Sequence, residues 1–447
     1  MFTGRSRPAD AHEDERDLPP RRQAWFVFAV LVLLMIMDYV DRQIVVSMFP
    51  HLRAEWALSD RQLGGLVSIV SVVVAIATVP LSLLADRWSR VKSISLMAVL
   101  WSIATIACAF ARDYGQLLVA RGVVGLGEAA YGAAGAALLA SIFPARQRGT
   151  VLGAFLGAGL VGSVLGVVLG GVIAEHSGWR AGFGVVGVPG LVLAILVWLF
   201  VRERGALSAP AARQGDDAVP LKDVVAELLR PRTVVYTCLG AGLQLLVVST
   251  IWAWAPSYFN RFHGLAPDAA GIRAGLIVLL GAVGAVGWSL LADRLARRDA
   301  RARLYVPAGV ACATAVCMCS AFGLAAPGPV QLALIMAGGV VMTGTIGAVA
   351  AVVVDVVNPT LRATAAAVLS LTQNLIGLAA GPLLAGALSD AYGLPFALSV
   401  VPLFCLAAAG LFITAASSYE ADSTRASRRL ANPKPDLVRS CLREEPT

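Results

Sequence analysis

Five ionisable residues lie inside two apolar stretches of the chain. Asp38, Asp41 and Arg42 occur in "MDYVDRQ", and Arg121 and Glu128 occur in "RGVVGLGEAAY". A charged side chain in a lipid environment is costly unless it is paired or hydrated, so each of the five is a functional candidate. Arginine stays charged, whereas the proton affinity of a carboxylate responds to burial and to neighbouring charges. Carboxylates beside guanidinium groups are therefore suited to holding and releasing a proton.

Depth along the expected helices brings these residues together. At about 1.5 Å per residue, Asp38 and Glu128 both fall near the middle of their apolar runs, with Asp41, Arg42 and Arg121 roughly 6–10 Å further outward. Arg121 and Glu128 are seven residues apart and so share one helix face. If the two runs face each other, the five charges form one ladder, with acids near the midplane and arginines above them.

Such a ladder suits proton coupling during a rocking motion. Separating Asp41 from its arginine would change the proton affinity of the carboxylate. We therefore expect Asp41, Glu128 and Asp38 to take part in proton coupling. The alternative is a static ion-pair network that fixes the packing of the two runs.

The composition of the chain explains where these charges are embedded. Of 447 residues, 58% are hydrophobic and 14% are charged, whereas soluble domains carry about a quarter charged residues. The apolar runs are long enough for an α-helix to cross a bilayer of about 30 Å, and they lack the alternation of barrel strands. We expect an all-α membrane protein with twelve spans, at 24–49, 62–85, 93–111, 115–142, 149–174, 180–201, 233–259, 269–292, 303–325, 328–356, 363–388 and 393–416.

The basic residues indicate the topology. With twelve spans both ends of the chain share one side, and 28 of the 36 Lys and Arg residues fall on that side, against 6 on the other. This asymmetry predicts cytoplasmic termini. The net charge of +8 is then a topology signal and gives no indication of nucleic-acid binding. The first 23 residues show no removable signal peptide, and the Arg-rich basic set favours a bacterial inner membrane.

The sequence contains an internal repeat. "SLLADR" occurs at Ser82–Arg87 and again at Ser289–Arg294, 207 residues later. A shift of 215 aligns another set of residues, Pro144 with Pro359, Gly171 with Gly386, Glu175 with Asp390 and Gly178 with Gly393. Two parallel halves of this kind are the architecture of major facilitator transporters. We expect two pseudo-symmetric six-helix bundles.

The expected domain boundaries follow from this repeat. They are a disordered cytoplasmic N-terminal tail at 1–23, bundles at 24–201 and 233–416, a cytoplasmic linker at 202–232, and a polar C-terminal tail at 417–447 that we expect to be disordered.

The first "SLLADRWSR" corner also resembles the G-x-L-a-D-R-x-G-R loop motif of the major facilitator superfamily, with Ser in place of both glycines. We expect Asp86 to latch onto the start of the eleventh span near Arg362, and Asp293 onto the start of the fifth near Arg148, because a helix N-terminus attracts an anion. The alternative is that these charges only set topology. The expected gating residues are Asp86, Arg87, Arg90, Asp293 and Arg294.

The C-terminal half has a different polar content. Its seventh and tenth spans carry neutral polar and aromatic residues and no charge before Asp355. One charged wall and one apolar, aromatic wall would match an amphipathic solute. Trp252 and Trp254 could equally be interfacial residues. The expected substrate-binding set is Arg42, Arg121, Trp252, Trp254, Gln244 and Asn374.

At the charged residues the resemblance narrows to Spinster-type transporters. "DYVDR" is similar to their N-Y-x-D-R, and "RGVVGLGEAAY" to their R-G-x-V-G-x-G-E-A-S-Y; the likeness spans about residues 35–395. It implies proton-linked transport of lysolipid-like or sphingoid-phosphate-like amphiphiles. It also implies protonation of Asp41, head-group or charge-pair contacts of Arg42 and Arg121, and coupling through Glu128.

The chain departs from the Spinster pattern at two places. Asp38 replaces an Asn, which leaves open whether Asp38 or Asp41 takes the proton, and Ala130 replaces a Ser. In the fifth span Gly153, Gly162, Gly166 and Gly170-Gly171 resemble an antiporter motif, with Val167 in place of its Pro. Close helix packing is a sufficient explanation of these glycines.

Other functions remain open at this point. The runner-up functions are proton-linked transport of a small organic anion or drug, and a transporter-shaped receptor or scaffold. We expect no enzyme activity, because His12, His51, His176 and His263 have no partner cluster in tails and loops. We expect no cofactor and no metal, since Cys312, Cys317 and Cys319 fit a helix as small apolar residues. The expected partners are the substrate, protons and the bilayer, and the expected state is a monomer.

Overall fold

The computed structural model describes residues 19–201, 230–358 and 361–431. Twelve helical spans in these ranges are long and apolar enough to cross a membrane, as predicted. Helices suit this environment because each satisfies its own backbone hydrogen bonds. The spans of the first half are α2 (Arg21–Ser47), α4 (Asp60–Arg87), α5 (Arg90–Ala109), α6 (Tyr114–Glu128) with α7 (Tyr131–Ile142), α8 (Ala145–Ser177) and α9 (Trp179–Phe200).

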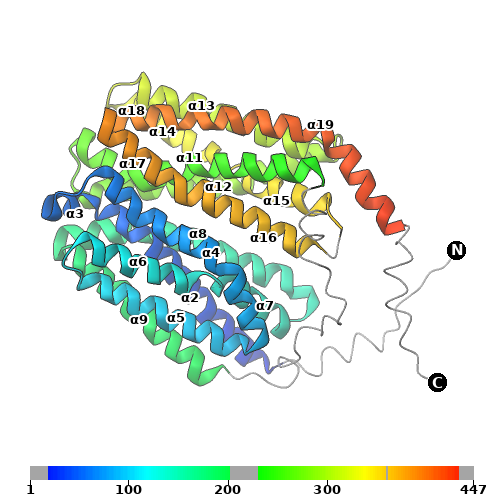
Figure 1. Cartoon of the computed structure of the whole chain (residues 1–447), viewed down its shortest axis with the longest axis horizontal. Helices are drawn as coiled ribbons and strands as arrows, with labels where there is room; N and C mark the ends of the chain where they lie inside the picture. Colours follow the sequence, from blue (N-terminus) through cyan, green and yellow to red (C-terminus); the bar gives the residue numbers. More distant parts are fainter. Residues whose placement is uncertain (1–18, 202–229, 359–360, 432–447) are drawn as a thin grey trace. The chain divides into compact units, whose positions relative to one another are not determined.

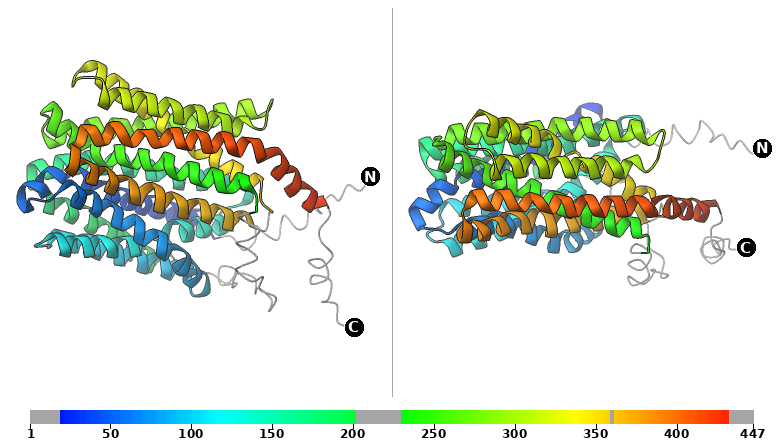
Figure 2. Two further views of the ribbon diagram at one scale, coloured as in Figure 1. Left: turned by 45° about the horizontal axis from the view of Figure 1, so that its top comes forward. Right: turned by 90° about the horizontal axis from the view of Figure 1, so that it is seen from above.

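A short helix, α3 (Phe49–Trp56), lies between the first two spans. The spans of the second half are α11 (Arg232–His263), α12 (Pro267–Ala296), α13 (Ala302–Gly323), α14 (Pro329–Met342) with α15 (Ile346–Asp355), α16 (Arg362–Thr372) with η3 (Gln373–Ala379) and α17 (Ala380–Tyr392), and α18 (Leu394–Val400) with η4 (Val401–Leu403) and α19 (Phe404–Ala431). Figures 1 and 2 show how the helices of each half run alongside one another.

The described chain divides into two compact units. One contains α2 to α9 together with Trp252–Leu279, and the other contains the remaining parts of α11 and α12 with α13 to α19. The division therefore cuts the seventh and eighth spans instead of the linker. Their segments within Trp252–Leu279 belong to the same compact unit as the N-terminal half.

The repeat predicted from the sequence is visible in the backbone. Gly178 ends α8 with φ of 79°, and Gly393 ends α17 with φ of 88°. Both residues connect one span directly to the next at a backbone conformation that favours glycine. The fourth and tenth spans are both interrupted near mid-length, at Ala129–Ala130 and at Thr343–Thr345. These breaks also align under the shift of 215.

Glycines bring the first span close to the fifth. A Cβ on Gly162 of α8 would lie 2.5 Å from the Ile36 carbonyl oxygen of α2, and one on Gly166 would lie 2.7 Å from that of Val40. Their counterparts, Gly377 and Gly381, lie against α11, Gly377 at the Leu245 side chain and Gly381 at the Leu246 carbonyl oxygen. The close packing expected from small residues in these spans is thus confirmed. Gly153, by contrast, faces open space.

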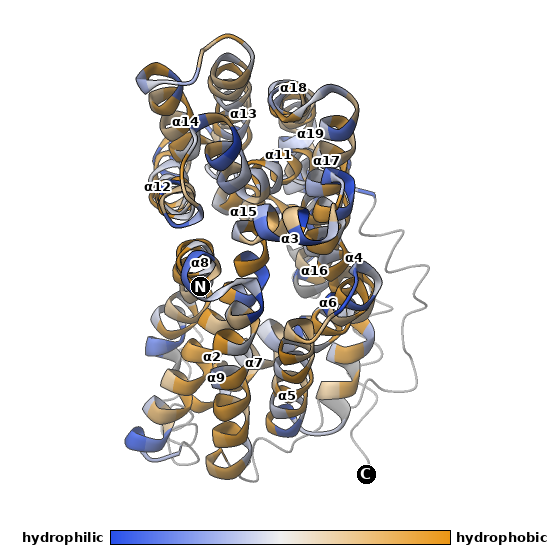
Figure 3. Ribbon diagram, turned by 90° about the vertical axis from the view of Figure 1, so that its left-hand side faces the viewer, coloured by the Kyte–Doolittle hydropathy of each residue, from blue (hydrophilic) through white to orange (hydrophobic). Residues whose placement is uncertain are grey.

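The surface of the N-terminal unit is apolar where lipid would cover it. Val185, Val188 and Val192 of α9 are each about half exposed, at 52%, 53% and 51%, and the apolar colouring of α5 and α9 is plain in Figure 3. Inside the same unit Trp101, Tyr131 and Phe155 form an aromatic core. The ring centroid of Tyr131 lies 5.1 Å from that of Trp101 and 6.2 Å from that of Phe155. These large rings fix α5, α7 and α8 around the charged residues.

The C-terminal end of the twelfth span differs from the prediction. The expected disordered tail from residue 417 is helical as far as Ala431, so the prediction was wrong for that segment. The reason is tertiary packing. Asp422 is 7% exposed and accepts hydrogen bonds from the Thr233 N–H at 3.1 Å and hydroxyl at 2.8 Å, which caps the start of α11. The tails at 1–18 and 432–447 and the linker at 202–229 lie outside the described residues.

Candidate functional site

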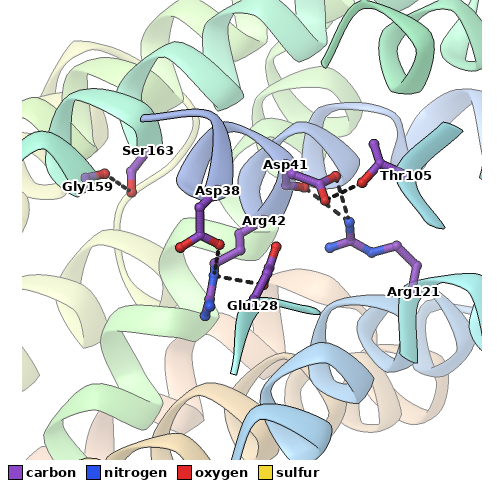
Figure 4. Close-up of polar contacts among 8 residues, drawn as sticks. All are labelled: Asp38, Asp41, Arg42, Thr105, Arg121, Glu128, Gly159 and Ser163. Carbon is purple, nitrogen blue, oxygen red and sulfur yellow. Dashed lines mark hydrogen bonds and ion pairs between the residues drawn. The ribbon is translucent and has the colours of Figure 1, made fainter. Parts of the chain in front are cut away.

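The first part of the site is an ion pair between α2 and α6. Arg121 Nη1 donates to Asp41 Oδ1 at 3.2 Å and to the Asp41 carbonyl oxygen at 3.1 Å. Thr105 of α5 donates its hydroxyl hydrogen to Asp41 Oδ2 at 2.6 Å. Asp41, Thr105 and Arg121 are at most 1% exposed. Each oxygen of this carboxylate therefore has a donor, as a buried charge requires (Figure 4).

The second part is a triad one turn away. Arg42 Nε donates to Asp38 Oδ1 at 3.2 Å and lies 3.0 Å from Glu128 Oε2. The side chains of Asp38 and Glu128 are buried, whereas that of Arg42 is 20% exposed. The Arg42 guanidinium also lies 5.4 Å from the centre of the Tyr39 ring. Arg42 is thus the member of the site that a solute can reach most easily (Figure 4).

Local features of α6 place Glu128 in this position. A Cβ on Gly125 would lie 2.7 Å from the Val70 carbonyl oxygen of α4, and one on Gly127 would lie 2.6 Å from the Trp101 nitrogen of α5. Only glycine permits such close approach on two sides. α6 then ends at Glu128. The carboxylate therefore sits at the break of the fourth span.

The predicted convergence of the five charges is confirmed. The first and fourth spans do bring Asp38, Asp41, Arg42, Arg121 and Glu128 together. The charges do not form the predicted single ladder. They separate into an Asp41–Arg121 pair and a triad around Arg42. Thr105 was missed, since a threonine in an apolar span gives no signal of its partner.

A neutral cluster joins the corresponding spans of the C-terminal unit. Gln244 Nε2 donates to Thr314 Oγ1 of α13 at 3.3 Å and to the Met342 carbonyl oxygen at 2.8 Å, at the break of the tenth span. Gln244 is 1% exposed, so a solute cannot reach it in this conformation. Its expected contact with substrate remains a prediction.

The remaining residues of the expected binding set are spread over the two units. Trp252 is half-buried, and Trp254 is fully buried against Phe49 of α3 at 5.3 Å between ring centroids, which excludes a lipid-facing position for Trp254. Asn374 lies in the π-helix η3, and its amide donates to the Ser370 carbonyl oxygen at 2.9 Å.

An ion-pair cluster on the expected outer side was missed by the sequence analysis. Arg261 at the end of α11 binds Asp60 through two hydrogen bonds of 2.7 Å, and Arg53 donates to the same carboxylate at 3.1 Å. Asp60 is 3% exposed. Such a bidentate arginine–carboxylate pair is geometrically specific. It holds the C-terminal end of the seventh span against α3 and α4.

The same short helix has a second polar anchor in its last turn. Trp179 Nε1 donates to Glu55 Oε2 at 2.6 Å, and Arg180 Nη1 lies 2.8 Å from Glu55 Oε1. The hydrogen bond from Trp179, together with Arg180, holds the pKa of Glu55 below its usual value. The connection α3 is thus fixed by polar contacts on both sides.

The expected gating residues are described only in part. Nothing can be said of the side chains of Asp86 and Arg87, which lie outside the described side chains; Arg90 is half-buried and Arg294 is exposed. Asp293 pairs with Arg303 at 3.3 Å, and Arg303 also pairs with Asp355 at 2.5 Å. The predicted latches across the two halves remain predictions.

Comparison with known proteins places the chain in a family. The model of the Major Facilitator Superfamily matches residues 31–380. The chain belongs to the major facilitator superfamily. It is a multi-pass membrane transporter and not an enzyme, in agreement with the sequence analysis.

Similar proteins within the superfamily have differing substrates. The hexuronate transporter of Bacillus subtilis (strain 168) is 25% identical over 277 residues, which covers 62% of this chain and 66% of the relative. The sphingosine-1-phosphate transporter SPNS2 of Mus musculus is 26% identical over 386 residues, covering 81% and 69%.

A solved structure supports the same fold. A bacterial homologue of the human lysosomal transporter Spinster, described as inward-facing and unoccupied, superposes with a TM-score of 0.81 at 22% identity, over 90% of this chain and 99% of that one. This likeness shows a shared fold, and the resemblance in sequence to Spinster-type transporters rests on the SPNS2 match.

Proposed function

We propose that this major facilitator is a proton-coupled transporter of an amphipathic lysolipid-like or sphingoid-phosphate-like substrate. The observation that carries the proposal is the buried cluster of three carboxylates and two arginines in the N-terminal unit. A purely structural network has no need of three buried acids, each of which costs free energy when unpaired. Proton coupling does need buried carboxylates, because they bind and release the proton.

The coupling step proposed for Asp41 follows from its contacts. Arg121 and Thr105 both stabilise the charged carboxylate in the described conformation. Movement of α6 relative to α2 would remove Arg121, and Asp41 would then gain a proton more readily. Binding and release of a proton would thus accompany the change of conformation.

The proposed substrate class has separate support. Arg42 is 20% exposed and can contact an anionic head group. The related SPNS2 is named a sphingosine-1-phosphate transporter. Trp252 is half-buried at the outer part of α11 and would pack against an apolar tail. We keep Arg42 and Trp252 as the substrate contacts to test first.

The decisive experiment is flux in proteoliposomes across an imposed pH gradient, with a labelled lysolipid as the solute. Wild-type flux should follow the gradient, and Asp41→Asn should abolish that dependence. Equal rates for the two proteins at every pH would end the coupling proposal. A receptor or scaffold predicts no flux at all, with no change in Asp41→Ala.

A second substrate class is favoured by one finding. The hexuronate transporter match makes a small organic anion the alternative, with Arg42 and Arg121 binding its carboxylate. Arg121 is 1% exposed and already bound to Asp41, which disfavours this alternative. Uptake of labelled glucuronate without lysolipid flux would establish it instead.

We also propose that both termini are cytoplasmic and that Asp86 latches the cytoplasmic side. The asymmetry of basic residues supports this topology. Asp86→Asn should shift the population toward the inward-open state, measured by crosslinking of paired cysteines. Unchanged crosslinking would remove the latch and leave transport itself untouched.

A further inference from the structure

The acids of the candidate site outnumber its arginines. Asp38, Asp41 and Glu128 are all buried, and Arg42 and Arg121 are the two arginines paired with them. With every group ionised, the cluster would carry one uncompensated negative charge. An uncompensated buried carboxylate is so costly that it usually takes up a proton instead.

The contacts show which acids share the uncompensated negative charge. Asp41 has Arg121 at one carboxylate oxygen and the Thr105 hydroxyl at the other. These donors all favour its ionised form. Asp41 and Arg121 therefore make a balanced pair. The excess negative charge falls on Asp38 and Glu128, which have Arg42 between them.

The shared atom of Arg42 cannot satisfy both acids. Asp38 Oδ1 and Glu128 Oε2 lie 3.2 and 3.0 Å from the same Nε, and this nitrogen carries one hydrogen. That hydrogen is donated to Asp38. Both oxygens of Glu128 are buried and lack a hydrogen-bond donor among the described residues. Two carboxylates in this arrangement repel each other, so one of them is protonated most easily.

The groups around the triad leave this imbalance in place. On α2, Tyr39 presents its ring to Arg42. On α7, the Tyr131 hydroxyl donates to the Leu31 carbonyl oxygen at 2.6 Å. On α8, the nearby Ser163 donates to the Gly159 carbonyl oxygen at 2.9 Å. These two hydroxyls thus donate to backbone oxygens and not to the acids (Figure 4 shows the bond of Ser163).

We propose that Asp38 and Glu128 together bind one proton around Arg42 at neutral pH, while Asp41 stays ionised. The triad is then a second proton-binding site, separate from the Asp41–Arg121 pair. This proposal deepens the proposed proton coupling, on which its role in transport rests. An amide at position 38 would leave Arg42 with Glu128 as its one acid, and the extra proton would no longer be needed.

Infrared difference spectroscopy of the purified full chain in lipid tests the proposal without any transport assay. The wild type should show the C=O stretching band of a protonated carboxyl at neutral pH. Asp38→Asn and Glu128→Gln should each abolish it, because either amide restores the charge balance. Asp41→Asn should retain it. Asp422→Asn is the matched control for a buried carboxylate outside the site, and it should also retain the band.

Three results would overturn the shared site: a wild type without the band, a band that survives Asp38→Asn or Glu128→Gln, or a band lost in Asp41→Asn. A pH series of thermal unfolding gives a second readout. The folded wild type should hold one more proton than the unfolded chain, so its stability should fall as pH rises, while that of Asp38→Asn should change less. Equal slopes would contradict the proposal. A failure of coupled flux with the band present would overturn only the proposed function.

Discussion

The two halves of the molecule use one scaffold for different chemistry. In the N-terminal half the first span contacts a threonine of the third, Thr105, and the break of the fourth at Glu128, through charged residues. In the C-terminal half the seventh span contacts a threonine of the ninth, Thr314, and the break of the tenth at the Met342 carbonyl, through the neutral Gln244. The same sets of spans are therefore joined by charges in one half and by an amide in the other.

Because of this difference, the polar contacts of the N-terminal half respond to pH, whereas those of the C-terminal half do not. The contacts of Asp41 and Glu128 depend on which acids are protonated, so their strength changes with pH and with the approach of an anion. An amide does not titrate, and the contacts of Gln244 keep one strength throughout. The comparison predicts that matched substitutions in the two halves have unequal consequences.

Removing an arginine should have the largest effect. Arg121→Met leaves Asp41 buried without its counter-charge, and breaking a buried pair in this way costs about 3–5 kcal/mol. We expect a large fall in the midpoint of thermal unfolding in detergent and no coupled flux. Adding Asp41→Leu to Arg121→Met removes the orphaned charge and should recover most of the stability. A double variant as unstable as the single one would show that packing, not charge, is what Arg121 supplies.

Much of this comparison could be predicted from the sequence. Charges in an apolar run are visible because lipid makes them rare, and the repeat of 215 residues placed Gly178 and Gly393 correctly at two span ends. Twelve spans follow from hydropathy alone. These features depend on residue type and local spacing.

The rest depends on tertiary contacts. Nothing in the sequence shows that Arg42 faces two acids while Arg121 faces one, because the two patterns differ only in side-chain direction. Asp60 and Arg261 are about two hundred residues apart and meet only after folding. The tail beyond residue 417 is polar, yet it is helical as far as Ala431. Its Asp422 accepts a hydrogen bond at the start of α11, and this contact is not visible in the sequence.

The two threonines offer a matched pair of tests. Thr105→Val removes a hydrogen bond to a charged carboxylate, which contributes about 1.5–3 kcal/mol. The charged form of Asp41 loses that support, so coupled flux should reach half its maximum at a pH about one to two units higher. Thr314→Val removes only a 3.3 Å contact to a neutral amide and should leave the pH profile unchanged. Thr105→Ser keeps the hydroxyl and should behave as wild type.

The glycines test whether both halves need equally close packing. Gly162→Val would place a side chain against the Ile36 carbonyl oxygen of α2, and overpacking of this kind costs about 1–3 kcal/mol. Because α2 carries three of the five charges, flux should fall more than stability does. Gly377→Val meets the Leu245 side chain of α11, whose Cβ would lie 2.8 Å away. Because α11 carries none of the five charges, the effect on flux should be smaller. Gly153→Val, at a position facing open space, is the control and should be neutral for stability.

The smallest effect is expected for Gln244→Leu. Thr314 retains its own bond to the Val310 carbonyl oxygen at 2.8 Å, so the main loss is the bond to the Met342 carbonyl, worth about 0.5–1.5 kcal/mol. Thermal unfolding should shift slightly, and the pH profile of flux should not move. Gln244→Glu sharpens the contrast, because only a protonated carboxyl can donate to that carbonyl. The stability of this variant should then fall as pH rises, which would give the C-terminal half a pH dependence of its own. A Gln244→Leu variant with a displaced pH profile would instead show that the neutral cluster takes part in coupling, and the division between the two halves would have to be abandoned.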